Sequence, residues 1–416
     1  MNWRRNFAQY GAIGTMLVAV LWLGLAVRLE SFVNRIEPTP LPAISPLARE
    51  VHDTSFVADL HADSLLFGRD LLKRSTMGHV DLPRLQEGGV GLQVFGYPSV
   101  VPVGTNIHRT ESGGLDSITL AGIAQLSPTA WLGPTGRALY RAEQLVDYAE
   151  NSQDALFLIR DRGDLADVLA ARANGGRVTG ALLAIEGAHA LESKPKNLQR
   201  LFDAGYRMIG LAHFFDNDYA GSSAGVEQGG LTELGRATLT EMEKLGIAAD
   251  VAHLSPTAID ELLDSATKPV VFSHGGVRGT CDNPRNLSDD HVRRIAAGGG
   301  VIGIGYWDIA ACGRAPADIA RAIAYVVDLV GADYAALGSD YDGGTEVGFD
   351  TSALPALTQA LFDAELSEEQ VRKVLGENVL RVLSDTLPAG GTLPAGGTLP
   401  AGGTLPAGGD ADSPNT

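Results

Sequence analysis

Cysteine is scarce in this chain of 416 residues, which contains only Cys281 and Cys312. Two thiols are too few for a network of disulfides or for a zinc site built from thiolates. Their number allows one disulfide. The sequence alone does not show whether their Cα atoms come close enough to form it.

Basic residues are also in short supply. The chain has 32 lysines and arginines against 50 aspartates and glutamates, which gives a net charge of −18 at pH 7. Nucleic acids and anionic membrane surfaces bind proteins through basic surfaces. The composition therefore argues against both as partners, and we expect no binding to nucleic acid.

One long apolar run without charged residues extends from Gly11 to Val27, with arginines on both sides. Its length is near the lower limit for a helix that spans a membrane, and no clear cleavage site follows directly. We therefore predict that residues 1–28 are a membrane anchor, in preference to a cleaved signal segment. The arginines at its start would stay in the cytoplasm, so the catalytic domain would be periplasmic or extracellular.

Low-complexity segments flank the central part of the chain. Residues 29–47 contain several prolines and are predicted to form a tether, and residues 386–416 begin with four tandem copies of Thr-Leu-Pro-Ala-Gly-Gly. A proline and two glycines in every six residues cannot build a packed core, so we expect a disordered tail. Residues 48–385 are left as a single globular domain.

Within this domain, apolar runs typical of β-strands alternate with helical segments. The eight candidate strands are Phe56–Leu60, Val90–Phe95, Gly180–Ile185, Met208–Leu211, Ile247–Val251, Val270–Phe272, Val301–Ile304 and Tyr334–Leu337. Strands that are apolar on both faces and alternate with helices form buried parallel sheets. Eight of them predict an α/β fold of the (β/α)8 TIM-barrel type.

Helices are expected between these strands. They are Ala142–Ala149, Ala155–Ala171, Leu198–Ala204, Thr232–Leu245, Thr257–Ala266, Asp289–Ala297 and Pro316–Val330. The segment 97–137 is rich in glycine, proline and serine and is predicted to form loops over the barrel mouth. A doubly wound open sheet is the competing architecture, but no glycine-rich dinucleotide or phosphate loop follows the first strand.

Metal-binding residue types follow several predicted strands at their carboxyl ends, where barrel enzymes carry their active sites. These residues are His61, Asp63, Glu186, His189, His213, His253, His274, Asp340 and Asp342. Side chains two apart on a strand share a face, so His61 and Asp63 provide half of a site for a divalent ion such as zinc.

The ligands are too many for one tetrahedral ion, which predicts two zinc ions that share a carboxylate. Glu186 is the expected bridge. One ion would be held by His61, Asp63 and Glu186, and the other by Glu186, His253 and His274. A water between the ions would lose a proton near neutral pH, and this bridging hydroxide would be the nucleophile. We treat His189 as a structural residue outside the ligand set.

An ordered set of motifs between about residues 56 and 383 resembles one known family. The motifs include Asp-Leu-His61-Ala-Asp63, Ala-Ile-Glu186-Gly, Leu-Ala-His213-Phe-Phe, Asp-Val-Ala-His253-Leu-Ser, Phe-Ser-His274, Asn-Pro-Arg285-Asn-Leu and Gly-Ser-Asp340-Tyr-Asp-Gly-Gly. The chain is similar in these motifs to the membrane dipeptidase family, also called renal dipeptidases, within the amidohydrolase-like zinc peptidases.

The resemblance implies a zinc-dependent dipeptidase whose two ions are bound by the five ligands given above, with Glu186 as the bridge. It further implies that His213 contacts the substrate and stabilises the tetrahedral intermediate. Arg285 would bind the carboxylate of the dipeptide, and Asp340 would transfer the proton. The expected substrates are dipeptides, including those with a carboxyl-terminal D-residue, and a homodimer is left open.

Two other functions stay open at this point. The first is another two-metal amidohydrolase that acts on a lactone, a phosphoester or an N-acyl amino acid. Several such enzymes use a modified lysine as the bridge, and no predicted strand end here carries a lysine. The second is a catalytically inactive, tethered barrel, which would be expected to lack a ligand or Asp340, whereas all are present.

Overall fold

The computed structural model describes residues 30–124 and 127–390. The predicted anchor and most of the predicted tail lie outside these residues. Within the described ranges, no helix has both the length and the apolar character needed to cross a bilayer.

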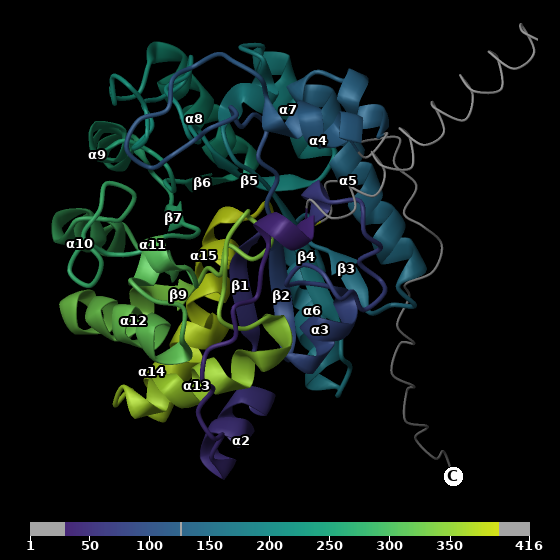
Figure 1. The fold of residues 1–416 in the computed structure, drawn as a ribbon, viewed down its shortest axis with the longest axis vertical. Coiled ribbons are helices and arrows are strands. Elements are labelled where there is room, and N and C mark those ends of the chain that lie inside the picture. Colours follow the sequence, from purple (N-terminus) through teal and green to yellow (C-terminus); the bar gives the residue numbers. More distant parts are fainter. Residues whose placement is uncertain (1–29, 125–126, 391–416) are drawn as a thin grey trace, which may run out of the picture.

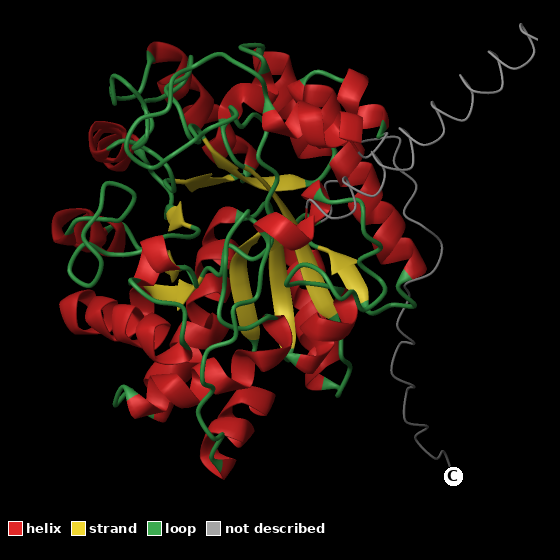
Figure 2. Cartoon of the chain, viewed as in Figure 1, coloured by secondary structure: helices red, strands yellow, loops and turns green. Residues whose placement is uncertain are grey.

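Nine parallel strands form the sheet at the centre of the molecule (Figures 1 and 2). They are β1 (Val57–Ala62), β2 (Val90–Phe95), β3 (Leu156–Leu158), β4 (Thr179–Ile185), β5 (Tyr206–Gly210), β6 (Ala248–Asp250), β7 (Val271–Phe272), β8 (Val301–Ile304) and β9 (Ala335–Leu337). Strand β1 pairs with both β2 and β9, and β2 also pairs with β4. These pairings close eight strands into a ring, which confirms the predicted barrel, and they exclude an open sheet.

The helices surround the ring (Figure 2). They are α2 (Pro46–Thr54), α3 (Leu82–Glu87), α4 (Ser117–Ala124), α5 (Pro134–Asn151), α6 (Arg162–Ala173), α7 (Pro195–Asp203), α8 (Glu233–Leu245), α9 (Pro256–Ser265), α10 (Asp289–Ala297), α11 (Asp308–Ala311), α12 (Pro316–Val330), α13 (Leu354–Asp363), α14 (Glu368–Arg372) and α15 (Asn378–Thr386). The barrel therefore has the alternating strand and helix order that the sequence predicts.

The interior of the ring is packed with apolar side chains. One cluster of buried residues takes side chains from every strand of the ring, including Leu60, Val94 and Met208, together with Val379 and Leu383 of α15. A barrel filled in this way is a solid core and not a pore. It can hold the loops at the carboxyl ends of its strands in fixed positions.

Strand β3 corrects one prediction. The sequence predicts one helix over 155–171, whereas the structure has β3 followed by α6. Leu156 and Leu158 pair with the first residues of β4, and Asp161 caps the helix by accepting a hydrogen bond from Asp164 N. The apolar run was too short for its periodicity to distinguish a strand from a helix.

The insertion between β2 and β3 is only partly irregular, which is a second correction. It contains α4 and the start of α5 in addition to loops. Ser99 donates hydrogen bonds to the carbonyl oxygens of Glu186 and Gly187, just beyond β4. The insertion therefore borders the carboxyl end of the barrel, as predicted.

Both flanking segments have described residues that pack on the barrel. Ile36, within the predicted tether, forms a parallel bridge with Val347. At the other end, Leu387 in the first repeat copy is 3% exposed, and Pro388 O accepts a hydrogen bond from Arg162 N. The packed part of the chain thus extends beyond 48–385 on both sides.

Candidate metal centre

The predicted ligands, together with the predicted catalytic residues His213 and Asp340, come from six different strand ends. His61 lies in β1, and Glu186, His213, His253, His274 and Asp340 follow β4, β5, β6, β7 and β9. Because all strands of the ring run parallel, their carboxyl ends meet at one edge of the barrel. The side chains are therefore brought to one site from distant parts of the sequence.

Glu186 is at the centre of this site. Its Oε1 lies 3.3 Å from His61 Nε2, and its Oε2 lies 3.1 Å from His253 Nε2 and 3.4 Å from His274 Nε2. His213 Nε2 is also 3.4 Å from Oε2. Each carboxylate oxygen thus faces a separate set of imidazoles, as a bridging ligand requires.

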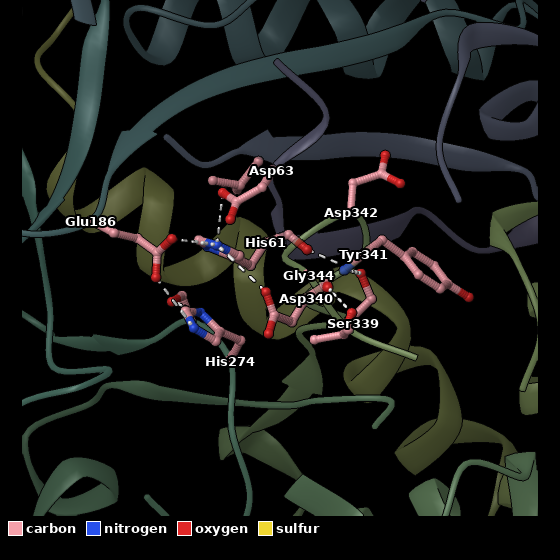
Figure 3. Close-up of polar contacts among 12 residues, drawn as sticks. His61, Asp63, Glu186, His274, Ser339, Asp340, Tyr341, Asp342 and Gly344 are labelled. Atoms are coloured by element: carbon pink, nitrogen blue, oxygen red, sulfur yellow. Dashed lines mark hydrogen bonds and ion pairs between the residues drawn. The ribbon is translucent and has the colours of Figure 1, made fainter. Parts of the chain in front are cut away.

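Two further carboxylates approach the same nitrogen of His61. Asp63 Oδ1 lies 3.4 Å and Asp340 Oδ1 4.0 Å from His61 Nε2. Figure 3 shows His61 between Glu186, Asp63 and Asp340. Asp340 has a φ of +57°, in the left-handed region that costs energy for a residue other than glycine. Such strain persists only where the surrounding structure enforces it, and it is common at active sites.

Three groups of these side chains are close enough to hold a metal ion. They are His61, Glu186 and His274; Glu186, His213 and His253; and His61, Asp63 and Asp340. All five predicted ligands lie within these groups, together with His213 and Asp340. The structure thus brings the predicted ligand residues together but divides them differently: His274 lies with His61, Asp63 with Asp340, and His253 with His213.

The donor set fits a divalent ion. His61 Nε2 and Asp63 Oδ1 are buried and have no hydrogen-bond partner within the described part of the chain. A buried polar atom without a partner carries a free-energy cost, which an ion bound at that atom would remove. Imidazole nitrogens and carboxylate oxygens are ligands that zinc accepts.

Metal binding needs neutral imidazoles and ionised carboxylates. Burial alone would lower the pKa of His61, but Glu186 and Asp63 beside it raise it well above the usual range, so a cation bound there would replace the proton of this ring. The other imidazoles of the site are neutral. Burial holds the pKa of His253 and His274 well below the usual range and lowers the pKa of His213. Burial by itself would raise the pKa of Glu186, but His213 and His61 bring it well below its usual value. In contrast, burial raises the pKa of Asp340 well above the ordinary range.

A hydrogen-bonded chain orients His274, and sequence analysis missed it. Ser273 Oγ donates to Asp250 Oδ2 (2.5 Å) and lies 2.8 Å from His274 Nδ1. The hydroxyl proton points to Asp250, so the hydroxyl oxygen accepts the Nδ1 proton and Nε2 remains free for an ion. The sequence does contain a signal for this chain: Asp250 ends β6 and Ser273 directly follows β7, so two polar residues stand at the ends of neighbouring apolar strands.

Arg285 lies beside this site with one donor free. Its Nη2 donates to His274 O (2.8 Å), its guanidinium lies over the Phe272 ring, and the residue is 6% exposed. Nη1 is buried without a partner among the described residues. A buried guanidinium with an unused donor is suited to bind an anion such as a carboxylate.

The loop that carries Arg285 is closed by a disulfide between Cys281 and Cys312, whose Cα atoms are 5.3 Å apart. This pairing answers the question that the sequence left open. Asn286 Nδ2 donates to Cys281 O (2.7 Å) and to Ile309 O (2.9 Å), which joins the same two segments. The Arg285 loop is therefore fixed to the segment after β8.

His189 is half-buried and lies outside the three metal groups. Its ring packs against Phe215, and its Nε2 lies 3.4 Å from Asn217 Nδ2. Burial lowers the pKa of His189 to about 4, so the ring is neutral at physiological pH.

Comparison with known proteins identifies the family. The sequence profile of "Membrane dipeptidase (Peptidase family M19)" matches residues 46–391. Dipeptidase aclJ of Aspergillus oryzae is 34% identical over 50% of this chain and 52% of its own length. Dipeptidase verJ of Clonostachys rogersoniana is 29% identical over 74% of this chain and 76% of its own length. The chain thus spans about half of the first relative and three quarters of the second.

A solved structure shares the fold. A metallopeptidase from Rhodobacter sphaeroides matches with a TM-score of 0.65 and 22% identity, over 80% of this chain and 99% of that one. The family profile covers the barrel and every strand end described above. The chain therefore belongs to the membrane dipeptidase family, peptidase family M19, a family of metallo-dipeptidases among the hydrolases.

Proposed function

We propose that this protein is a zinc-dependent dipeptidase with two zinc ions per chain. His61, Asp63 and Glu186 would hold one ion, and Glu186, His253 and His274 the other. The observation that carries the proposal is the position of Glu186, whose two oxygens face different imidazoles at 3.3 and 3.1 Å. When bound, the zinc ions would polarise the scissile carbonyl and make a bound water acidic enough to attack it near neutral pH.

Asp340 is proposed to move the proton. Its carboxylate would accept a proton from the attacking water and pass it to the leaving amine. Its position 4.0 Å from His61 Nε2 keeps it beside the reacting centre.

His213 and Arg285 are proposed to bind the substrate. His213 would donate a hydrogen bond to the oxyanion that develops on the scissile carbonyl. Arg285 would bind the terminal carboxylate of the dipeptide through its free Nη1. Recognition of this terminal carboxylate would place the peptide bond of the carboxyl-terminal residue at the metal centre.

The proposed substrates include dipeptides with a carboxyl-terminal D-residue. The Rhodobacter sphaeroides metallopeptidase is liganded with a phosphinate mimic of the dipeptide L-Ala-D-Ala. We extend the binding of such a dipeptide to the present chain as part of the proposal. We further propose that residues 1–28 anchor the enzyme in a membrane, with the barrel in the periplasm or outside the cell.

The function is tested with full-length protein purified in detergent. Zinc per chain and hydrolysis of L-Ala-L-Ala and L-Ala-D-Ala are measured before chelation, after chelation, and after zinc is restored. We expect two zinc ions per chain, and activity that is lost and recovered with them. Hydrolysis of a lactone, a phosphoester or an N-acyl amino acid, without any dipeptide hydrolysis, would overturn the proposal.

A further inference from the structure

The segment that precedes the barrel is packed along the loop that carries Asp340. We call residues 30–39 the arm and residues 340–348 the Asp340 loop. Four hydrogen bonds join them: Glu37 N to Val347 O (2.8 Å), Val347 N to Arg35 O (3.0 Å), Thr39 N to Gly348 O (3.2 Å) and Gly344 N to Asn34 Oδ1 (2.8 Å). The arm therefore adds a strand-like layer to the outside of this loop.

The arm also places a charged residue in the interior. Glu30 is 5% exposed, and its Oε1 accepts a hydrogen bond of 2.5 Å from Arg69 Nε. Arg69 continues the contact, because its Nη2 donates to Asp342 Oδ2 and its Nη1 donates to Val80 O. One guanidinium thus connects the start of the arm to a carboxylate of the Asp340 loop.

Asp342 is the point where this network meets the candidate metal centre. It is fully buried, and it accepts hydrogen bonds from Ser64 Oγ (2.5 Å) and His79 N (2.6 Å). Ser64 is the neighbour of Asp63, and Asp342 is two residues from Asp340. Both Asp340 and Asp342 have a positive φ, +57° and +62°, so this loop depends on its contacts to keep its conformation.

Two carboxylates share one guanidinium in this network. Burial alone would raise the pKa of Asp342, but Arg69 and His79 lower it below the usual value, so Asp342 is ionised. Burial raises the pKa of Glu30 to about 7 despite Arg69. Glu30 Oε1 is the hydrogen-bond acceptor of Arg69 Nε, and an amide oxygen can accept the same bond.

We propose that Glu30 and Arg69 are positioning residues that act through Asp342 to hold the Asp340 loop in its catalytic conformation. This inference rests on the proposed role of Asp340 in proton transfer. Without the arm, Arg69 would lose one of its carboxylate partners and the loop would lose its outer layer. The side chain of Asp340 would then leave its productive position in a fraction of the molecules, which lowers turnover.

The test compares three variants of the full-length enzyme. Glu30→Ala removes the acceptor, and Glu30→Gln keeps an acceptor for Arg69. Glu37→Ala is the control, because Glu37 is an exposed residue of the same arm whose side chain lies 3.9 Å from Arg35 and is 51% exposed. We expect Glu30→Ala to lower kcat about tenfold at unchanged KM and zinc content. The kcat of Glu30→Gln and of Glu37→Ala should stay within about twofold of the kcat of the parent enzyme.

Hydrogen exchange measures the contact between the arm and the Asp340 loop without any substrate. The amides of Gly344 and Val347 should exchange faster in Glu30→Ala than in the parent or in Glu37→Ala. If dipeptide hydrolysis is absent in the parent enzyme, the proposed function fails. The exchange rates of these amides would still show whether the arm holds the Asp340 loop. Unchanged exchange in Glu30→Ala, or a loss of zinc parallel to the loss of kcat, would overturn the inference.

A fourth variant, Asn34→Ala, tests the inference if Glu30→Ala does not fold. Asn34→Ala removes only the hydrogen bond to Gly344 N and leaves Arg69 paired. It should speed exchange at Gly344 and lower kcat in the same direction, with the zinc content retained. If Asn34→Ala changes neither exchange nor kcat, the arm does not hold the loop.

Discussion

Glu186 and His253 come from different strand ends, and their Oε2 and Nε2 atoms lie 3.1 Å apart. The other oxygen of Glu186 faces His61 at 3.3 Å. A carboxylate in this position can serve two ions at once. The relationship also identifies the residue whose loss should affect both ions together.

We expect Glu186→Gln to lose zinc and activity together. The amide has one oxygen and no charge, so it cannot bridge two cations as a carboxylate does. Metal analysis of the purified variant should find fewer zinc ions per chain than in the parent enzyme. His189→Asn is the matched control, because His189 lies three residues away and outside the metal groups. Retention of both ions in Glu186→Gln would contradict the bridging role.

Asp340→Asn should separate metal binding from turnover. The amide cannot accept and return a proton, so we expect kcat to fall about 100- to 10,000-fold while the zinc content is unchanged. Steady-state kinetics and metal analysis on the same preparation would measure both. An equal loss of zinc and activity would show that Asp340 is a metal ligand, in agreement with its position near His61 and Asp63.

Arg285→Lys should weaken the binding of the terminal carboxylate. Lysine keeps the charge but loses the planar pair of donors, and we expect KM to rise about 10- to 100-fold with a smaller change in kcat. A dipeptide amide, which lacks the carboxylate, gives the control. The parent enzyme should discriminate strongly against it, and the variant should discriminate much less. Equal discrimination by both proteins would exclude Arg285 from this contact.

Removal of the disulfide should loosen the Arg285 loop. In Cys281→Ser combined with Cys312→Ser, we expect a loss of about 2–4 kcal/mol of stability, which urea denaturation would measure. KM for dipeptides should rise, because Asn286 and Arg285 lose a fixed support, while the zinc content stays the same. An unchanged KM would show that the hydrogen bonds of Asn286 are sufficient to hold the loop.

Stability should fall in mild acid because of His52. This residue is 1% exposed, its Nε2 donates to Gly88 O (2.9 Å) and its Nδ1 accepts from Thr358 Oγ1 (2.7 Å). Burial lowers the pKa of His52 below its ordinary value of 6.5, so the unfolded chain binds a proton that the native state does not. Its contribution to stability is complete above pH 6.5 and is lost as the pH falls towards the folded pKa.

Denaturation in urea at several pH values would measure this effect. The contribution of one histidine is at most about 1.4 kcal/mol per pH unit. His52→Asn removes the titrating group, so the stability of the variant should depend less on pH between 7 and 5 than that of the parent protein. Equal pH dependence in both proteins would show that His52 does not contribute. The metal ligands are the same in both, so their titration cancels.

The sequence by itself determined the barrel and most of its site. The eight ring strands were predictable because a buried parallel strand is apolar on both faces, and this pattern is local. His61, Glu186, His253 and His274 were predictable for the same reason, since each stands at or just past such a run. Parallel strands then bring those positions to one edge whatever their distance in the sequence.

Only the tertiary structure decided the features that depend on contacts between distant segments. Strand β3 exists because β4 offers it a partner, and the pairing of Cys281 with Cys312 depends on where two loops end. The contact of Glu30 with Arg69 joins the arm to the barrel core through side chains that carry no local pattern. Burial and hydrogen bonding at these positions result from the packing of the whole chain, which no short window of sequence encodes.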